Sequence, residues 1–122
     1  MTRAGGRVPP GQYITHKFPV MSYGKTPTID KATWTFLIHG LVNTPVTLTL
    51  QEFLRLPKIK VVADLHCVTQ WSRLNNHWEG VSFRELLKLA NPSPEAKFVM
   101  LHCNGDYTTN IPIWALMDEN VL

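Results

Sequence analysis

Proline and glycine interrupt every apolar segment of this chain, and these interruptions exclude folds that need long helices or strands. The sequence holds nine prolines and seven glycines, and a proline lacks the backbone N–H that a helix interior needs. Pro57 ends one helical pattern, and the Asn-Pro-Ser-Pro run at residues 91–94 ends another. No apolar run approaches the ~20 residues of a membrane span. The sequence therefore predicts a β-rich α+β fold with short strands, two short helices and long connections.

Several segments have the alternation or the β-branched enrichment that is typical of strands. In the clearest one, Trp34, Phe36 and Ile38 fall on one face. The segment that ends at Cys103 is nearly all apolar, so we expect it to be buried. Residues 1–12 and 21–31 are expected to be an irregular arm and a loop. The segments expected to be extended are residues 13–20, 34–39, 46–48, 60–63, 98–103 and 107–111.

Two capping boxes mark the helices, each with a hydroxyl residue three positions before a glutamate. The second predicted helix has an apolar stripe made of Phe83, Leu86, Leu87 and Ala90. Pro112 stands where a further helical first turn can begin. The predicted helices are residues 50–56, with Thr49 and Glu52 as the box, and residues 83–90, with Ser82 and Glu85.

Charge and composition restrict the partners of the chain. Twelve basic and nine acidic residues give a net charge of +3, and no basic arm or aromatic platform for nucleic acid is present. With 44% hydrophobic and 17% charged residues, the 122 residues fit a single globular domain. Residues 1–7 show no apolar export signal, so the sequence predicts the cytoplasm and reduced thiols at Cys67 and Cys103.

Residues 64–72, Asp-Leu-His-Cys-Val-Thr-Gln-Trp-Ser, hold the most informative chemistry. A cysteine at the end of a strand can direct a thiolate at a soft metal while the following loop leaves one side open. The alternative interpretation is a buried structural cysteine. A further alternative is zinc, because His66-Cys67 and His102-Cys103 repeat a dipeptide at two strand ends. Adjacent strand residues point to opposite faces, which disfavours a shared ion.

Three motifs occur in an order that resembles one family. They are His-Cys-Val-Thr-x-Trp-Ser at residues 66–72, Trp-Glu-Gly-Val at 78–81 and Val-Pro-Pro-Gly-Gln at 8–12. The chain resembles the molybdopterin-binding oxidoreductases of the sulfite oxidase superfamily, specifically the small members without haem. The resemblance implies a mixed β-rich sulfite oxidase-type fold, with residues 1–122 as a single, incomplete molybdopterin-binding domain. It also implies two-electron oxygen-atom transfer on a small oxo-anion or sulfoxide substrate, with an electron partner that the sequence does not identify.

The resemblance also implies roles for individual residues. Cys67 matches the molybdenum ligand, and Arg73 is the cation expected to meet an oxyanion. The cofactor contacts that the resemblance implies are Thr15, His16, Lys17, Cys67, His102 and Cys103.

Two departures from the family pattern leave alternatives open. Sulfite oxidases carry paired arginines shortly after the cysteine, where this chain has Trp71-Ser72, so relatives that act on sulfoxides fit better. The family's domain also continues beyond residue 122. We therefore weigh a catalytically inactive partial domain that folds or self-associates without cofactor.

The resemblance gives a last expectation about the two thiols. We expect Cys67 to lie at the mouth of a cleft, more reactive than a buried Cys103. The cations expected to favour its thiolate are Arg73 and His66.

Overall fold

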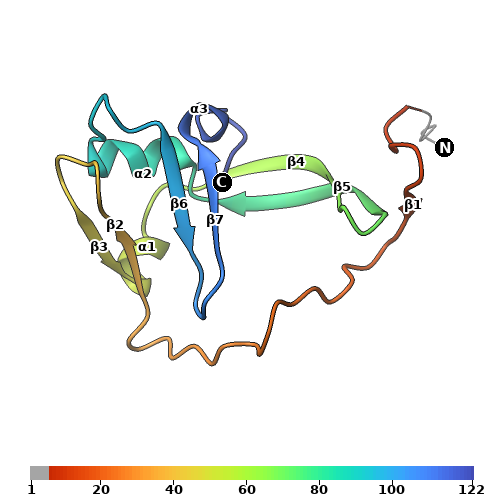
Figure 1. Cartoon of the computed structure of the whole chain (residues 1–122), viewed down its shortest axis with the longest axis horizontal. Helices are drawn as coiled ribbons and strands as arrows, with labels where there is room; N and C mark the ends of the chain where they lie inside the picture. The colour runs from red at the N-terminus through yellow and green to blue at the C-terminus, as the bar shows by residue number, and fades with distance from the viewer. Residues whose placement is uncertain (1–5) are drawn as a thin grey trace. The chain divides into compact units, whose positions relative to one another are not determined.

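The computed structural model describes residues 6–122, which form two compact units (Figure 1). The first unit combines the N-terminal residues up to Met21 with Lys60–Glu79, and the second combines Ser22–Ile59 with Gly80–Leu122. Short strands predominate over short helices in the described residues, which confirms the mixed α+β class. Residues 6–12 consist of turns and irregular backbone, while residues 1–5 of the expected arm lie outside the description.

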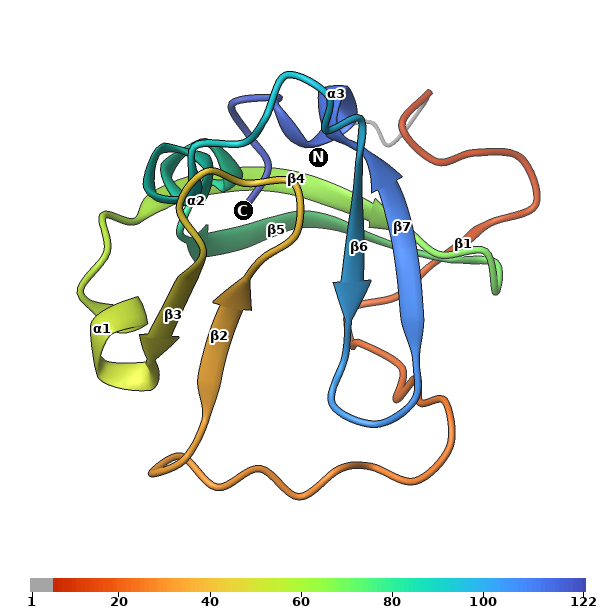
Figure 2. The same ribbon diagram turned by 60° about the vertical axis from the view of Figure 1, so that its left-hand side comes forward.

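The first unit is built on a three-stranded sheet in the order β1-β5-β4. These strands are β1 (Tyr13–Ile14), β4 (Ile59–His66) and β5 (Trp71–Gly80). β1 runs parallel to β5, with Tyr13 opposite Trp71, whereas β4 and β5 run in opposite directions (Figure 2). The expected extended segment at residues 13–20 therefore contributes only two strand residues, and the strand expected at 60–63 is longer than predicted.

Strand β5 was not predicted from the sequence, in which its first residues were taken as part of the loop after Cys67. Its segment is rich in polar side chains, and Asn75 has a positive φ of 55°. Tertiary contacts compensate for this weak strand pattern. The Asn75 N–H donates to the Asp64 carboxylate over 2.8 Å, and the Arg7 guanidinium donates to the same carboxylate over 2.6 and 3.0 Å.

The second unit begins with an antiparallel pair that carries an aromatic cluster. β2 (Thr35–Ile38) pairs with β3 (Val46–Thr49), and α1 (Leu50–Leu54) follows directly. The Phe36 ring lies 6.3 Å from Trp34 and 5.0 Å from Phe53, so the predicted face of β2 packs on the helix. Both bonds of the Thr49 and Glu52 capping box are present. The helix ends at Leu54, two residues before the predicted end.

Helix α2 (Phe83–Ala90) matches the predicted bounds. The Ser82 hydroxyl accepts from the Glu85 N–H over 3.3 Å, but the Glu85 carboxylate binds Lys88 at 2.6 Å instead of completing the box. Asn91 ends the helix in the left-handed region with a φ of 48°. Ala90, the last residue of the apolar stripe, is completely buried.

The C-terminal part of the second unit is a hairpin followed by one helical turn. β6 (Phe98–His102) pairs antiparallel with β7 (Thr108–Pro112), and α3 (Ile113–Leu116) follows, as Pro112 predicted. The expectation that β6 is buried is wrong, since Phe98 is 66% and Met100 52% exposed. β6 has one neighbour in a two-stranded sheet. Burial requires a covering layer, which an apolar run cannot supply by itself.

Few side chains are fully enclosed. The buried apolar residues are Trp71, Val81 and Ala90, and the buried polar ones are Ser72, Asn76 and Ser82. Three of these six, Trp71, Ser72 and Asn76, lie on β5, so this strand forms the centre of the first unit. Within the described residues, no helix is long and apolar enough to cross a membrane.

Candidate functional site

Cys67 stands at the first position after β4, as its place in the sequence predicted. Its N–H donates to the Trp71 carbonyl over 2.9 Å, and its own carbonyl accepts from the Gln70 N–H over 3.1 Å. Gln70 has a φ of 73°, a conformation that a non-glycine residue adopts only when the surroundings enforce it. The tight turn from Cys67 to Trp71 thus holds a half-buried thiol in one place.

The environment of Cys67 favours its thiolate. Its Sγ lies 3.1 Å from the Thr69 hydroxyl. This hydrogen bond is the main cause that lowers the pKa of Cys67, and the backbone N–H groups of Thr69 and Val68 act in the same direction against burial. Arg73 and His66 were expected to supply this effect, but uncharged hydrogen-bond donors do so. A lowered pKa raises the fraction of thiolate, which is the form that binds a metal.

A chain of hydrogen bonds lies behind the turn. The Gln12 amide Nε2–H donates to the Cys67 carbonyl over 2.8 Å, and the Gln12 Oε1 accepts from the Ser72 hydroxyl over 2.8 Å. The His66 Nδ1 lies 2.8 Å from the same hydroxyl oxygen. Ser72 is completely buried and Trp71 is 4% exposed, so both side chains are enclosed within the first unit.

Arg73 is half-buried and its guanidinium is engaged on two sides. Nη1 donates to the Asn76 side-chain oxygen, and Nε donates to the His16 carbonyl over 3.3 Å. The guanidinium carbon lies 4.5 Å from the centre of the Phe18 ring, within cation–π range. Among the described residues, Nη2 has no hydrogen-bond partner.

The segment with Thr15, His16 and Lys17 lies beside β5, the strand that carries Arg73. The Thr15 N–H donates to the Ser72 carbonyl over 2.9 Å, continuing the pairing of β1 with β5. The Thr15 hydroxyl accepts from the Lys17 N–H over 3.2 Å, which bends the backbone there. His16 and Lys17 are exposed. Thr15, His16 and Cys67 therefore each hydrogen-bond to the first residues of β5, the strand that carries Arg73.

His102 and Cys103 belong to the second unit. Cys103 follows β6, and its N–H donates to the Tyr107 carbonyl over 3.0 Å. The rings of His102 and His39 stack with their centres 6.5 Å apart. Cys103 is exposed while Cys67 is half-buried, so the expectation that Cys103 is the more buried thiol is wrong. Both thiols are free, as expected.

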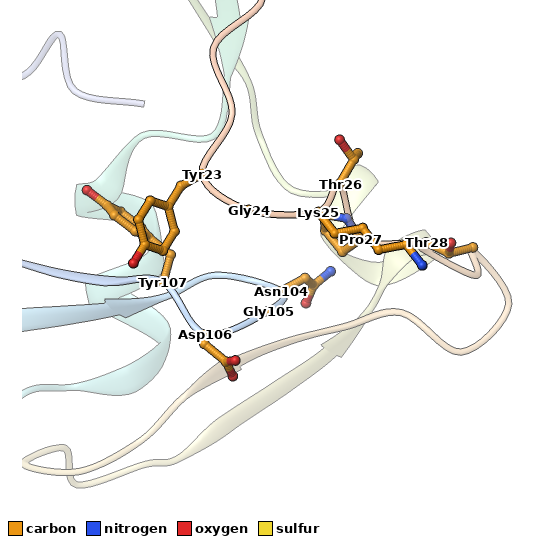
Figure 3. Close-up of a pocket in the computed structure, with 10 residues that line it drawn as sticks. All are labelled: Tyr23, Gly24, Lys25, Thr26, Pro27, Thr28, Asn104, Gly105, Asp106 and Tyr107. Carbon is orange, nitrogen blue, oxygen red and sulfur yellow. The ribbon is translucent and has the colours of Figure 1, made fainter.

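The zinc alternative gains no support. Within residues 6–122 there is no group of three or more His, Cys, Asp and Glu side chains that could hold a metal ion. A hollow of about 420 Å³ lies in the second unit and includes none of the predicted site residues (Figure 3). The rings of Tyr23 and Tyr107 lie at one end of it with their centres 5.2 Å apart. It is lined by residues 23–28 and 104–107.

Two contacts of Cys67, with Thr69 and with Gln12, were not predicted from the sequence. Thr69 is two residues away, so its position in the turn could have indicated the contact with the thiol. Gln12 is 55 positions away and has no local signal beyond its place in the Val-Pro-Pro-Gly-Gln motif.

The chain resembles several known oxidoreductases in sequence. It is 38% identical over 118 residues to the uncharacterized oxidoreductase YuiH of Bacillus subtilis, covering 96% of this chain and 60% of that protein. It is 33% identical over 105 residues to a putative protein-methionine-sulfoxide reductase subunit of Azospira oryzae, covering 84% and 40%. The chain therefore spans less than two thirds of the length of these relatives.

A solved structure and a domain family also match. The sulfane dehydrogenase SoxCD from Paracoccus pantotrophus superposes with a TM-score of 0.66 at 22% identity, over 76% of this chain and 29% of that one. This likeness confirms the predicted fold. The family described as the oxidoreductase molybdopterin binding domain matches residues 23–122. Since this match covers most of the chain, the protein belongs to the oxidoreductase molybdopterin-binding domain family, as the sequence motifs predicted.

Proposed function

We propose that this chain supplies the molybdopterin-binding site of an oxidoreductase that transfers an oxygen atom to or from a small oxo substrate. In this proposal Cys67 is the protein ligand of molybdenum, and both units are parts of one cofactor-binding domain. The observation that carries it is the preformed turn that holds a low-pKa thiol at the end of β4, in a chain of this family.

The donor set of the first unit fits a phosphate-bearing pterin held through a thiolate. A thiolate suits a soft metal, and the hydroxyl, imidazole and ammonium groups of Thr15, His16 and Lys17 suit phosphate and pterin acceptors. The buried Trp71 Nε1–H has no hydrogen-bond partner among the described residues. An unpaired buried donor is costly, so it gives a bound acceptor an energetic advantage.

The chemistry of the bound group is a two-electron change at molybdenum as an oxygen atom moves on or off the substrate. The residues of the chain bind and orient. Cys67 anchors the metal through its thiolate, and the free Nη2 of Arg73 orients a substrate oxygen. Because Asn76, the His16 carbonyl and Phe18 already restrain the rest of the guanidinium, it has little freedom left to lose on binding.

The substrate class in this proposal is sulfoxide-like or sulfite-like. Arg73 shortly follows Cys67 and offers one cation, which suits a neutral or weakly charged sulfoxide better than a doubly charged oxyanion. The resemblance to a putative protein-methionine-sulfoxide reductase subunit favours the same class.

Metal and pterin analysis of the unchanged chain and two variants tests the proposal. We expect the chain purified from a cofactor-producing host to hold molybdenum, Cys67→Ser to lose most of it, and the control Gln51→Met, on the exposed surface of α1, to retain it. Equal molybdenum in Cys67→Ser and the unchanged chain would contradict the assignment of Cys67. Molybdenum in none of the three would contradict cofactor binding by these 122 residues.

A second candidate is a domain that folds and self-associates without cofactor. It is favoured by the exposed apolar side chains of the second unit, among them Phe98, Met100 and Trp114. Sedimentation of the purified chain distinguishes the two candidates. Oligomers free of molybdenum support the second, and a 13.9 kDa species with bound cofactor contradicts it.

A further inference from the structure

The hydrogen-bond chain behind Cys67 has only one consistent direction. A backbone carbonyl can only accept, so the Gln12 atom that meets the Cys67 carbonyl at 2.8 Å is its NH2 group. The other end of the amide is then the oxygen, which can only accept. The Ser72 hydroxyl, 2.8 Å from that oxygen, therefore gives its single proton to Gln12.

This direction determines which nitrogen of His66 carries a proton. The Ser72 oxygen has no second proton, so it can only accept from the His66 Nδ1 at 2.8 Å. Nδ1 must be protonated, and in the neutral ring Nε2 is left with a lone pair. Ser72 is completely buried, so water cannot readily substitute for either of its partners.

We propose that Gln12 is a positioning residue for Cys67: its amide holds the Cys67 carbonyl and, through Ser72, sets the neighbouring His66 with Nδ1 protonated and Nε2 as an acceptor. The positioning role rests on the proposed function, whereas the direction of the hydrogen bonds does not. The Val-Pro-Pro-Gly-Gln motif thereby acquires a physical role, because it delivers Gln12 to a turn 55 positions later in the chain.

Two substitutions at Gln12 test the two hydrogen bonds of its side-chain amide separately. Gln12→Glu keeps an oxygen for the Ser72 hydroxyl but offers no donor to the Cys67 carbonyl. Gln12→Met has a similar length and removes both bonds, so the Ser72 hydroxyl becomes free to donate to His66 Nδ1. We expect Nδ1–H in the unchanged chain and in Gln12→Glu, and a shift to the Nε2–H tautomer in Gln12→Met.

The tautomer is measured by long-range ¹H–¹⁵N NMR on the cofactor-free chain at about pH 8, above the usual histidine pKa of ~6.5. Gln51→Met, on the exposed surface of α1, is the matched control. The same His66 tautomer in Gln12→Met and in the unchanged chain would overturn the proposal, as would an equal shift in Gln51→Met. Ser72→Ala removes the acceptor of the His66 Nδ1–H itself and gives a second test if Gln12→Met does not fold: an unshifted Nδ1–H tautomer in Ser72→Ala would overturn the proposal.

The positioning role has a readout of its own. Both Gln12 variants should speed amide exchange at Cys67 and molybdenum loss on dialysis by about two- to tenfold, the effect of one lost hydrogen bond. Unchanged rates in both would overturn the positioning role. The Cys67→Ser variant keeps Gln12, Ser72 and His66 in place. Full molybdenum retention in it would defeat the proposed function, while the tautomer result is decided separately.

Discussion

Phe18 is the side chain on which the proposed pterin-binding segment rests against β5. Its ring lies 6.0 Å from Trp71 in an edge-on arrangement and 6.1 Å from Trp78, and the Arg73 guanidinium lies 4.5 Å above it. Phe18 directly follows Lys17 in the chain. Loss of the ring should therefore weaken the first unit and release both the segment and the guanidinium.

The size of the effect follows from these contacts. Full burial of a phenylalanine contributes about 1.5–3 kcal/mol, and Phe18 is 47% exposed, so about 1 kcal/mol of burial is lost in Phe18→Ala. Two aromatic contacts add roughly 0.5 kcal/mol each, and an exposed cation–π contact adds a similar amount. We expect Phe18→Ala to cost about 2.5 kcal/mol, and Phe18→Leu, which keeps most of the apolar area, about 1.5 kcal/mol.

Urea unfolding followed by tryptophan fluorescence measures this cost. Replacing Trp34 and Trp114 by phenylalanine leaves Trp71 and Trp78, both in the first unit, as the reporters. In the same background, Phe53→Ala removes an aromatic ring from the second unit and serves as the control. A loss below about 0.5 kcal/mol in Phe18→Ala, or an equal loss in Phe18→Leu, would refute the reasoning.

Two further predictions concern ionisable groups. Thr69→Val removes the hydroxyl that lowers the pKa of Cys67, so the rise of Cys67 alkylation with pH should move to higher pH. Thr69→Ser keeps the hydroxyl and should keep the wild-type profile. An alkylation profile that Thr69→Val leaves unchanged would contradict the role of Thr69. The pKa of Asp64 is lowered by the Arg7 guanidinium and then by the Asn75 N–H, so its contribution to stability is present above the unfolded-state pKa of ~3.9 and is lost as pH falls through the folded-state value. Asp64→Asn should therefore flatten the acid limb of the stability curve, measured by urea unfolding between pH 2 and 6, and an equally steep limb in the variant would count against this assignment.

Local signals in the sequence predicted the features that depend on neighbours within a few residues. The Thr49 and Glu52 capping box forms as expected because both partners lie in one helical turn. The bounds of α2 follow from the Ser82 cap and from Asn91 in the same way. Cys67 lies at a strand end because neighbouring residues specify both the β-branched run before it and the turn after it.

Features that depend on distant partners were not predictable in this way. β5 is polar and contains a left-handed residue, and it forms a strand because β1, 58 positions earlier at the Tyr13–Trp71 pair, and Asp64 satisfy its backbone. The apolar run of β6 predicted burial, but β6 has a single partner strand, β7, and Phe98 is exposed.

The candidate site also combines features set by neighbouring residues with features set by distant ones. Its family and the place of the Cys67 thiol at a strand end could be inferred from the sequence by itself, since a motif of adjacent residues specifies both the turn and the Thr69 hydroxyl beside the sulfur. Only the tertiary structure decided that Gln12 and Ser72 support that turn and that Arg73 is restrained by His16 and Phe18. Hydrogen-bond direction and burial are properties of groups that folding brings together, and no spacing along the chain encodes them.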